Sequence, residues 1–194
     1  MGVISFSFKI INKTKKSEAR TCLVKTSHGN FKTPAFVPVA TTATVRALSS
    51  EDVENLGAEV ILANTYHLHL RPGDKLIKKL GGLHKFMSWD KPIITDSGGF
   101  QAFSLGFGME HGVGKIGNIF PRNKNAERNK KLAVVDNKGV SFSSPIDGKK
   151  IRLTPKKSIE IQENLGADII LAFDECTSPF SDYSYTKLAM VRTH

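Results

Sequence analysis

Three stretches of the chain run from aliphatic residues directly into polar side chains, and this pattern constrains the fold more than any other feature. The stretches are 60–66, 92–98 and 168–175. Parallel α/β sheets bury their strands on both faces and carry reactive groups where the strands end. The pattern therefore predicts parallel strands with chemistry on Asn64, Asp96 and Asp174.

Two of these strands belong to a repeated unit. Segments 55–63 and 164–172 share the order Asn-Leu-Gly-Ala, an acidic residue and an aliphatic run. Each glycine suits the position after a helix end, where a left-handed backbone is favoured, and each aliphatic run has the length of a strand. The two copies are too far apart for a solenoid. We interpret them as two units of one barrel or one doubly wound sheet.

Composition and charge limit the classes of protein to which the chain can belong. Hydrophobic residues make up 40% of the chain and charged residues 24%, and no apolar run is long enough to cross a bilayer. The N-terminus lacks the apolar block of a signal peptide, so we expect a cytoplasmic protein with no membrane partner. The net charge of +10 fits a polyanionic partner, or else a solvated lysine-rich surface. Cys22 and Cys176 are too few and too far apart for a disulfide scaffold, and we expect reduced thiols.

Local patterns predict the order of the elements. Ser49 or Ser50 caps a helix, and Thr154 caps another with proline in its first position. The expected elements are a β-rich segment at 1–40, strand 60–65, an extended segment at 66–73, helix 74–80 ended by Gly81 and Gly82, strand 92–95, a mobile insertion at 106–138, a hairpin of 140–146 and 151–153 around a two-residue turn at Asp147-Gly148, helix 155–165, a strand ending at Asp174 and a helix from 186.

The residues that follow strand 92–95 suit recognition of a nucleobase. Gly98 and Gly99 allow close approach of the backbone to a planar ligand, Phe100 offers an aromatic face, and Gln101 offers a side-chain amide. The alternative is that Asp96 only caps a turn. Asp174 adds a second carboxylate, and two acids at one pocket permit acid–base or glycosyl-transfer chemistry.

Two further groups have open interpretations. His67 and His69 are candidate metal ligands, but we favour the interpretation of one packed and one solvated imidazole. Cys176 is a candidate nucleophile. We favour a partly buried thiol that lines the pocket.

Several motifs, in one order along the chain, resemble those of the tRNA-guanine transglycosylases, also called queuine tRNA-ribosyltransferases. The motifs are 64–68 (NTYHL), 70–73 (LRPG), 81–87 (GGLHKFM), 95–101 (TDSGGFQ), 158–162 (SIEIQ) and 173–177 (FDECT). The resemblance extends over nearly the whole chain apart from 106–138.

The resemblance implies a fold and a reaction. The expected fold is α/β, a (β/α)8 TIM-type barrel of which residues 1–194 form the N-terminal portion of a single domain, with 1–40 as a short β extension. The expected reaction exchanges guanine at the anticodon wobble position of tRNA for queuine or a 7-deazaguanine precursor, through a covalent ribosyl-enzyme. The partners implied are the tRNA anticodon loop, the deazaguanine base and a second subunit, identical or related.

The resemblance also implies residue roles. Asp96 is expected to act as the acid–base aspartate that contacts the base, and Asp174 to bind the amino and N1 edge of the base. The remaining expected pocket residues are Ser97, Gly98, Gly99, Phe100, Gln101 and Cys176. Of these, Phe100 is expected to stack on the ring of the base.

Other family features fall outside this sequence. The nucleophilic aspartate and the ligands of a structural zinc ion are implied beyond residue 194, so we expect no metal or cofactor within the chain and no base exchange by these residues alone. Alternatives are a non-catalytic tRNA-binding partner subunit, which intact Asp96 and Asp174 disfavour, and an archaeal enzyme that inserts a nitrile-bearing deazaguanine. Apart from the resemblance, a nucleoside-processing barrel hydrolase that uses Asp96 and Asp174 remains open.

Overall fold

The computed structural model describes residues 6–101, 133–144, 146–177 and 181–194. The chain divides into two compact units, which are described one at a time. The first consists of Met1–Asp96 and Ile161–Leu171, and the second of Ser97–Glu160 and Ala172–His194. Among the described residues, no helix is both long enough and apolar enough to cross a membrane.

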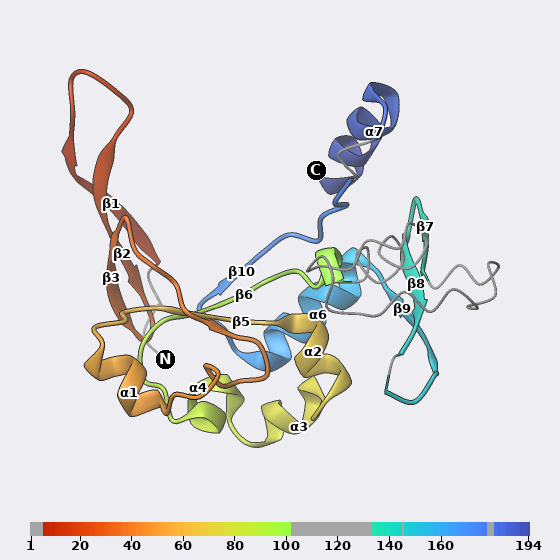
Figure 1. Ribbon diagram of the computed structural model, residues 1–194, viewed down its shortest axis with the longest axis horizontal. Helices are drawn as coiled ribbons and strands as arrows, with labels where there is room; N and C mark the ends of the chain where they lie inside the picture. Colours follow the sequence, from red (N-terminus) through yellow and green to blue (C-terminus); the bar gives the residue numbers. More distant parts are fainter. Residues whose placement is uncertain (1–5, 102–132, 145, 178–180) are drawn as a thin grey trace. The chain divides into compact units, whose positions relative to one another are not determined.

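A parallel sheet forms the centre of the first unit (Figure 1). Its strands, in the order β10-β6-β5-β4, are β10 (Ile169–Ile170), β6 (Ile93–Thr95), β5 (Ile61–Ala63) and β4 (Val39–Ala40). All three neighbouring pairs are parallel. The side chains of Ile61, Ile93 and Thr95 are at most 1% exposed and share one face of the sheet, while Leu62 and Ile94 on the other face are partly buried. The predicted parallel strands are thus confirmed as a four-stranded open sheet.

Short helices follow the strands of this sheet. They are α1 (Ser50–Asn55), α2 (Thr65–Leu70), α3 (Asp74–Lys79) and α4 (Gly82–Met87). Ser49 caps α1 through a capping box with Asp52, which confirms the prediction for that helix. The expected extended segment at 66–73 is wrong, because Asn64 accepts a hydrogen bond from the His67 N–H group and starts α2 there. Alternation over six residues does not distinguish a strand from a short helix whose inner face is buried.

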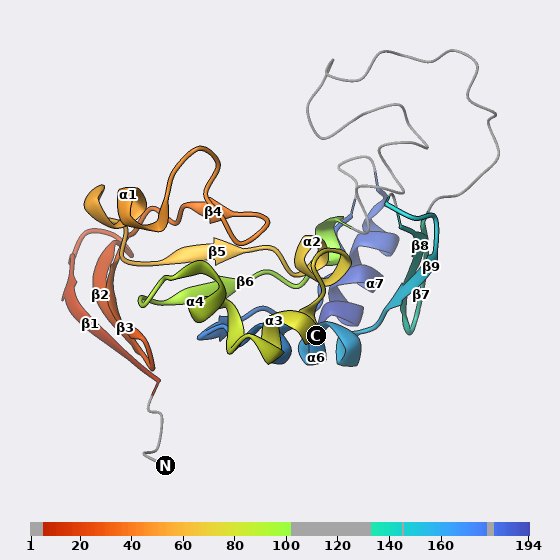
Figure 2. The same cartoon turned by 90° about the horizontal axis from the view of Figure 1, so that it is seen from below.

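An antiparallel sheet makes up the N-terminal part of the first unit, as predicted for 1–40. Its strands are β1 (Ser7–Lys13), β2 (Arg20–Thr26) and β3 (Gly29–Thr33), in that order. Figure 2 shows this sheet beside one end of the strands of the parallel sheet. Val24 and Phe31 from β2 and β3 form a buried cluster with Val60, against which Ile94 and Ile169 pack. The apolar cluster joins the two sheets at the ends of the parallel strands opposite Asn64 and Asp96.

The repeated unit is confirmed in its local geometry. Gly57 and Gly166 follow helix ends with φ of 83° and 73°, values that favour glycine. The strands that follow, β5 and β10, both lie in the parallel sheet. The similarity of the two segments therefore reflects the same turn from helix to strand, used twice.

Strand β10 is shorter than predicted. It ends at Ile170, not at Asp174, because the side-chain amide of Gln162 takes the place of a neighbouring strand. Gln162 accepts a hydrogen bond from the Leu171 N–H group at 3.0 Å and donates to the Leu171 carbonyl at 3.0 Å. Its oxygen also accepts from the Thr95 hydroxyl at 2.9 Å. A buried amide thus ends β10 and ties it to the end of β6.

Replacement of Gln162 by leucine is expected to lower the free energy of unfolding by about 2–4 kcal/mol, because buried partners lose their hydrogen bonds at a cost of about 1–3 kcal/mol each. Urea denaturation followed by circular dichroism measures this change. Glu163→Ala is the matched control, because Glu163 is exposed on the same helix. Equal midpoints for the two variants would contradict a structural role for the Gln162 amide.

A buried polar cluster fixes α3 within the first unit. Asp74 is 3% exposed and lies 2.7 Å from His69 Nδ1, and Asn164 donates to Asp74 at 2.6 Å. Lys78 in turn donates to Asn164 at 3.0 Å. Burial alone would raise the pKa of Asp74, but the hydrogen bonds from Asn164 and His69 together hold this pKa below its usual value.

Asp74 is therefore expected to make the protein sensitive to acid. A carboxyl group whose pKa is lowered on folding contributes stability above its unfolded pKa, and this contribution is lost as the pH falls below about 4. We expect the difference in unfolding midpoint between the wild type and Asp74→Asn to shrink between pH 6 and pH 3, as urea denaturation at the two pH values would show. A difference independent of pH would contradict this linkage. Exposed Asp90→Asn serves as the control.

The second unit contains a three-stranded antiparallel sheet and a helix. The strands are β7 (Ala133–Asp136), β8 (Gly139–Ser143) and β9 (Lys150–Leu153), and the helix is α7 (Tyr183–Thr193), which confirms the predicted C-terminal helix. The predicted pairing of β8 with β9 is also confirmed, but the connection is longer than two residues, since Ser144 N–H bonds to the Lys149 carbonyl.

The expected mobile insertion at 106–138 is wrong for 133–138, because β7 pairs with β8 there, while 106–132 lie outside the described residues. Helix α6 (Pro155–Leu165) confirms the predicted helix, and its cap Thr154 accepts from the Lys157 N–H group at 3.1 Å. Its first residues belong to the second unit and its last to the first.

Candidate functional site

Asp96 lies at the carboxyl end of β6, beside the residues that follow β5. Its carboxylate accepts hydrogen bonds from the Asn64 side-chain amide and, at 2.8 Å, from the Thr65 N–H group. The Thr65 hydroxyl donates to the Asp96 carbonyl oxygen. Both carboxylate oxygens are therefore held, while the half-buried side chain keeps access to solvent. Asn64 and Asp96, which were predicted to follow parallel strands, thus lie in contact at the ends of the neighbouring strands β5 and β6.

Asn64 uses both ends of its amide. The oxygen accepts from the His67 N–H group at 3.0 Å and caps α2, while the nitrogen donates to Asp96. Since the side chain is 5% exposed, it has little freedom to leave this position. The helix cap therefore orients the carboxylate, and both depend on the same residue.

Ser97, Gly99 and Asp174 come together in the second unit. The Ser97 hydroxyl donates to Asp174 Oδ1 at 2.6 Å and accepts from the Gly99 N–H group at 3.0 Å. The buried Ser158 hydroxyl donates to the Ser97 carbonyl at 2.6 Å. One serine thus joins the turn after β6 to the predicted base-binding carboxylate, and Ser158 fixes the position of that serine.

Gly99 has no room for a side chain. A Cβ atom at this position would lie 2.5 Å from the Asp174 carbonyl oxygen and 2.8 Å from Asp174 Oδ1. Gly98 is needed for a different reason, since its φ of 77° lies in the left-handed region that side chains disfavour. The two adjacent glycines therefore serve separate needs, one of close approach and one of backbone conformation.

Helix α7 anchors the segment that carries Asp174. The N–H group of Glu175 donates to the Thr193 hydroxyl at 3.1 Å, and Arg192 lies 3.0 Å from the Glu175 carboxylate. Tyr185 donates to the same carboxylate at 2.6 Å. The hydrogen bond to Glu175, reinforced by burial, raises the pKa of Tyr185, so this phenol stays a donor. The Glu175 carboxylate therefore holds helix α7, and Asp174 is the neighbouring carboxylate that remains for a ligand.

A pocket in the second unit has Asp174 and Cys176 on its wall. Gly99, the turn between β7 and β8, and Arg192 complete most of the lining. Burial and the neighbouring Asp174 raise the pKa of the Cys176 thiol, which disfavours the thiolate that a nucleophile requires. The interpretation of Cys176 as a partly buried pocket thiol is favoured over the nucleophile. Cys22 is buried, and both cysteines are free.

The remaining predicted residues directly follow Gly99, which lines this pocket. Phe100 and Gln101 follow Gly99 in helical conformation, and Phe100 is 44% exposed. An exposed ring is accessible to a planar ligand, so its predicted stacking role stays a prediction. In the first unit Thr65 bonds to Asp96 and Gln162 bonds to Thr95, and in the second unit Ser158 bonds to Ser97, although sequence reasoning gave these three residues no role. Motif 158–162 was the available signal, since it carries two of the three.

The proposed metal pair of His67 and His69 does not form a ligand cluster with other described residues. His69 instead bonds to Asp74. The structural zinc that the resemblance implies needs three cysteines, and the chain has only Cys22 and Cys176, in different units. The residues present therefore do not fit that zinc site.

The parallel sheet with fixed polar groups at its carboxyl strand ends defines an α/β protein, a class in which ligands commonly bind at that edge. The family model of queuine tRNA-ribosyltransferase matches residues 15–194. This chain belongs to the queuine tRNA-ribosyltransferase family.

Curated relatives carry the same family name. A protein of Archaeoglobus fulgidus, provisionally named queuine tRNA-ribosyltransferase, is 65% identical over 179 residues, which are 88% of this chain and 44% of that protein. Queuine tRNA-ribosyltransferases of Natranaerobius thermophilus and Herpetosiphon aurantiacus are 46% and 50% identical, over 98% and 91% of this chain and 45% and 39% of theirs. The chain thus spans less than half the length of these relatives.

Proposed function

We propose that the protein carrying this chain is a tRNA-guanine transglycosylase. In this proposal it exchanges guanine at the anticodon wobble position for queuine or a related 7-deazaguanine, as a pentosyltransferase in queuosine modification of tRNA. The family match over residues 15–194 supports the proposal, and so does the hydrogen-bonded group of Ser97, Gly99 and Asp174.

The proposed chemistry assigns distinct tasks to the two aspartates. Asp174 would accept hydrogen bonds from the amino and N1 groups of the base. Because its carboxylate is held in place and only accepts hydrogen bonds, it would favour bases with donors at these two positions. Asp96 would exchange protons with the departing and incoming bases as general acid and base. Asn64 and Thr65 would act as positioning residues, because they hold the Asp96 carboxylate.

Ser97, Gly98, Gly99, Phe100, Gln101 and Cys176 would line the base pocket in this proposal. The exchange breaks one N-glycosidic bond and forms another, so it needs no external energy source, and a covalent ribosyl-enzyme would divide it into two displacements. The nucleophile of that step is not assigned to any residue of this chain.

The proposal extends to fold and partners. We infer a (β/α)8 barrel to which the parallel strands β4, β5, β6 and β10 contribute, as one domain that includes residues 1–194. The partners would be a tRNA, which the positive net charge favours, a free deazaguanine and a second subunit. A cytoplasmic location fits this set of partners.

Incorporation of labelled guanine into unfractionated tRNA tests the proposal. We expect label in tRNA and no release of guanine from free guanosine by the same protein. Hydrolysis of guanosine without incorporation would instead support a nucleoside hydrolase. Binding of tRNA without incorporation would support a non-catalytic subunit, and either result would overturn the transglycosylase.

A further inference from the structure

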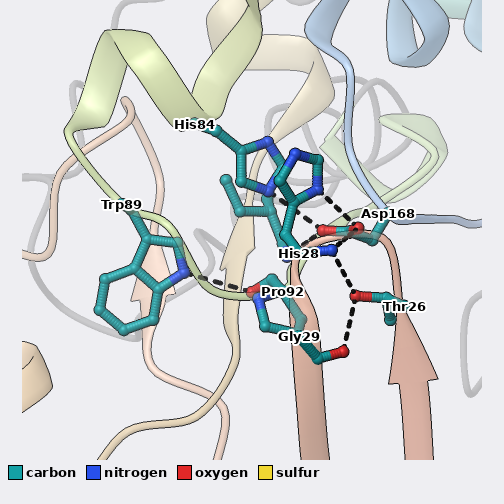
Figure 3. Close-up of polar contacts among 8 residues, drawn as sticks. Thr26, His28, Gly29, His84, Trp89, Pro92 and Asp168 are labelled. Carbon is teal, nitrogen blue, oxygen red and sulfur yellow. Dashed lines mark hydrogen bonds and ion pairs between the residues drawn. The ribbon is translucent and has the colours of Figure 1, made fainter.

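Two histidines and one aspartate meet in the first unit, apart from the residues assigned above. His28 lies in the turn between β2 and β3, His84 lies in α4, and Asp168 directly precedes β10. Figure 3 shows both imidazole rings directed at the Asp168 carboxylate. One ring nitrogen of each histidine and a carboxylate oxygen all lie within 4.8 Å of one another.

The carboxylate is held in a symmetrical manner. Asp168 Oδ1 lies 2.8 Å from His28 Nδ1 and accepts from the His28 N–H group at 3.3 Å. Oδ2 lies 3.1 Å from His84 Nε2 and accepts from the Ile93 N–H group at 3.0 Å. Each oxygen thus has one backbone donor, which fixes its position, and one imidazole. Backbone hydrogen bonds of this kind orient the carboxylate ligands of metal sites.

The two imidazoles lie next to each other, and each contacts a different oxygen of the Asp168 carboxylate. Their rings stack with centroids 3.5 Å apart and an interplanar angle of 19°. Zinc–nitrogen and zinc–oxygen bonds of about 2.0–2.2 Å at a tetrahedral angle separate two ligand atoms by about 3.3 Å. The observed nitrogen–oxygen distances of 2.8 and 3.1 Å are short of this by a few tenths of an ångström. Replacing the two imidazole–carboxylate contacts by one metal ion therefore requires a small opening of the cluster and a turn of the stacked rings toward the ion.

Burial differs among the three side chains in a way that suits entry of an ion. Asp168 is 1% exposed and His84 9%, whereas His28 is 42% exposed. The inner two ligands are pre-positioned, and the outer one leaves a path to solvent and room for a water ligand. Two imidazoles with one carboxylate suit zinc and similar transition metals, while magnesium and calcium prefer oxygen ligands throughout.

We propose that His28, His84 and Asp168 bind one divalent transition metal ion of the zinc class. The site uses no thiolate, so it is separate from the structural zinc that the family resemblance implies. A bound ion would tie the β2–β3 turn and α4 to the start of β10. Binding would then stabilise the native state by a free energy that grows with the logarithm of the free metal concentration once this exceeds the Kd.

The test compares metal binding by the wild type, His28→Ala and His69→Ala, each stripped with a chelator. Cobalt(II) serves as the spectroscopic probe, and zinc stoichiometry is measured by equilibrium dialysis. His69 is a matched control because it also pairs with an aspartate, at 2.7 Å, in the same unit. We expect the wild type and His69→Ala to bind one equivalent more than His28→Ala, or to bind it at least 10-fold more tightly. Equal binding by the wild type and His28→Ala would overturn the proposal.

A second measurement needs no substitution at the cluster. Zinc added to the stripped wild type is expected to shift the ring nitrogen NMR signals of His28 Nδ1 and His84 Nε2 and to raise the melting temperature. His28 is the ligand chosen for replacement because its exposure makes unfolding of the variant less of a risk than at buried Asp168. Unchanged signals of both rings at saturating zinc would refute the site even if a variant failed to fold. Neither measurement depends on base exchange.

Discussion

Replacement of Asp96 by alanine is expected to lower guanine exchange into tRNA by about 10²–10⁴-fold, the range typical for loss of a general acid–base group. The structure supplies the physical reason for a large effect. Asn64 and Thr65 hold the carboxylate at the end of β6, and alanine has no group that could accept these hydrogen bonds or transfer a proton. Initial rates at saturating tRNA, with tRNA affinity measured separately, would isolate the chemical step.

Two variants serve as comparisons for Asp96→Ala. Asp90→Ala removes an exposed carboxylate from the same unit and is expected to leave exchange unchanged. Asn64→Ala removes one contact of the Asp96 side chain while that of the Thr65 N–H group remains, so we expect a smaller loss than for Asp96→Ala. A fully active, folded Asp96→Ala protein would contradict the proposed role.

Replacement of Gly99 by alanine is expected to weaken binding of the free base by about 10-fold or more. The added methyl group would lie 2.5 Å from the Asp174 carbonyl and 2.8 Å from its carboxylate, so Asp174 has to shift. Overpacking of this kind costs about 1–3 kcal/mol, and here the displaced group is the proposed reader of the base. The KM for guanine in the exchange reaction, together with calorimetric titration of guanine, measures the effect.

Gly57→Ala is the matched control for this glycine. Its Cβ would meet nothing within 4 Å, but its φ of 83° makes alanine strained by about 1–2 kcal/mol. The control is therefore expected to lower stability without a change in base affinity. If Gly99→Ala lowered stability to the same extent and left base affinity intact, Gly99 would be a structural glycine with no part in the pocket.

The sequence predicted the strand ends better than the segments between them. Aliphatic runs that end in Asn64 and Asp96 indicated adjacent parallel strands, because burial on both faces leaves a continuous apolar signal. The helix that starts at Thr65 was missed, since Asn64 as a strand-end residue and Asn64 as a helix cap give the same local pattern.

Features that depend on distant partners were outside the reach of local patterns. Gln162 ends β10 through bonds to Leu171 and Thr95, and nothing in the aliphatic run that follows Asp168 marks its early end. The cluster of His28, His84 and Asp168 joins residues 84 and 140 positions apart. No spacing rule connects such residues, so only the fold could bring them to notice.

The family resemblance supplied the roles of Asp96 and Asp174, and the structure supplied the contacts that make those roles physically reasonable. Ser97 is the clearest case, since its hydroxyl bonds to Asp174 while its carbonyl accepts from Ser158. The sequence showed these three residues only as parts of separate motifs.

The most direct measurement is incorporation of labelled guanine into one tRNA made in two forms, with guanine or with adenine at the wobble position. The protein carrying this chain is expected to label only the form with wobble guanine. Label in both forms, or in neither while guanosine is hydrolysed, would contradict a transglycosylase that reads the base through Asp174.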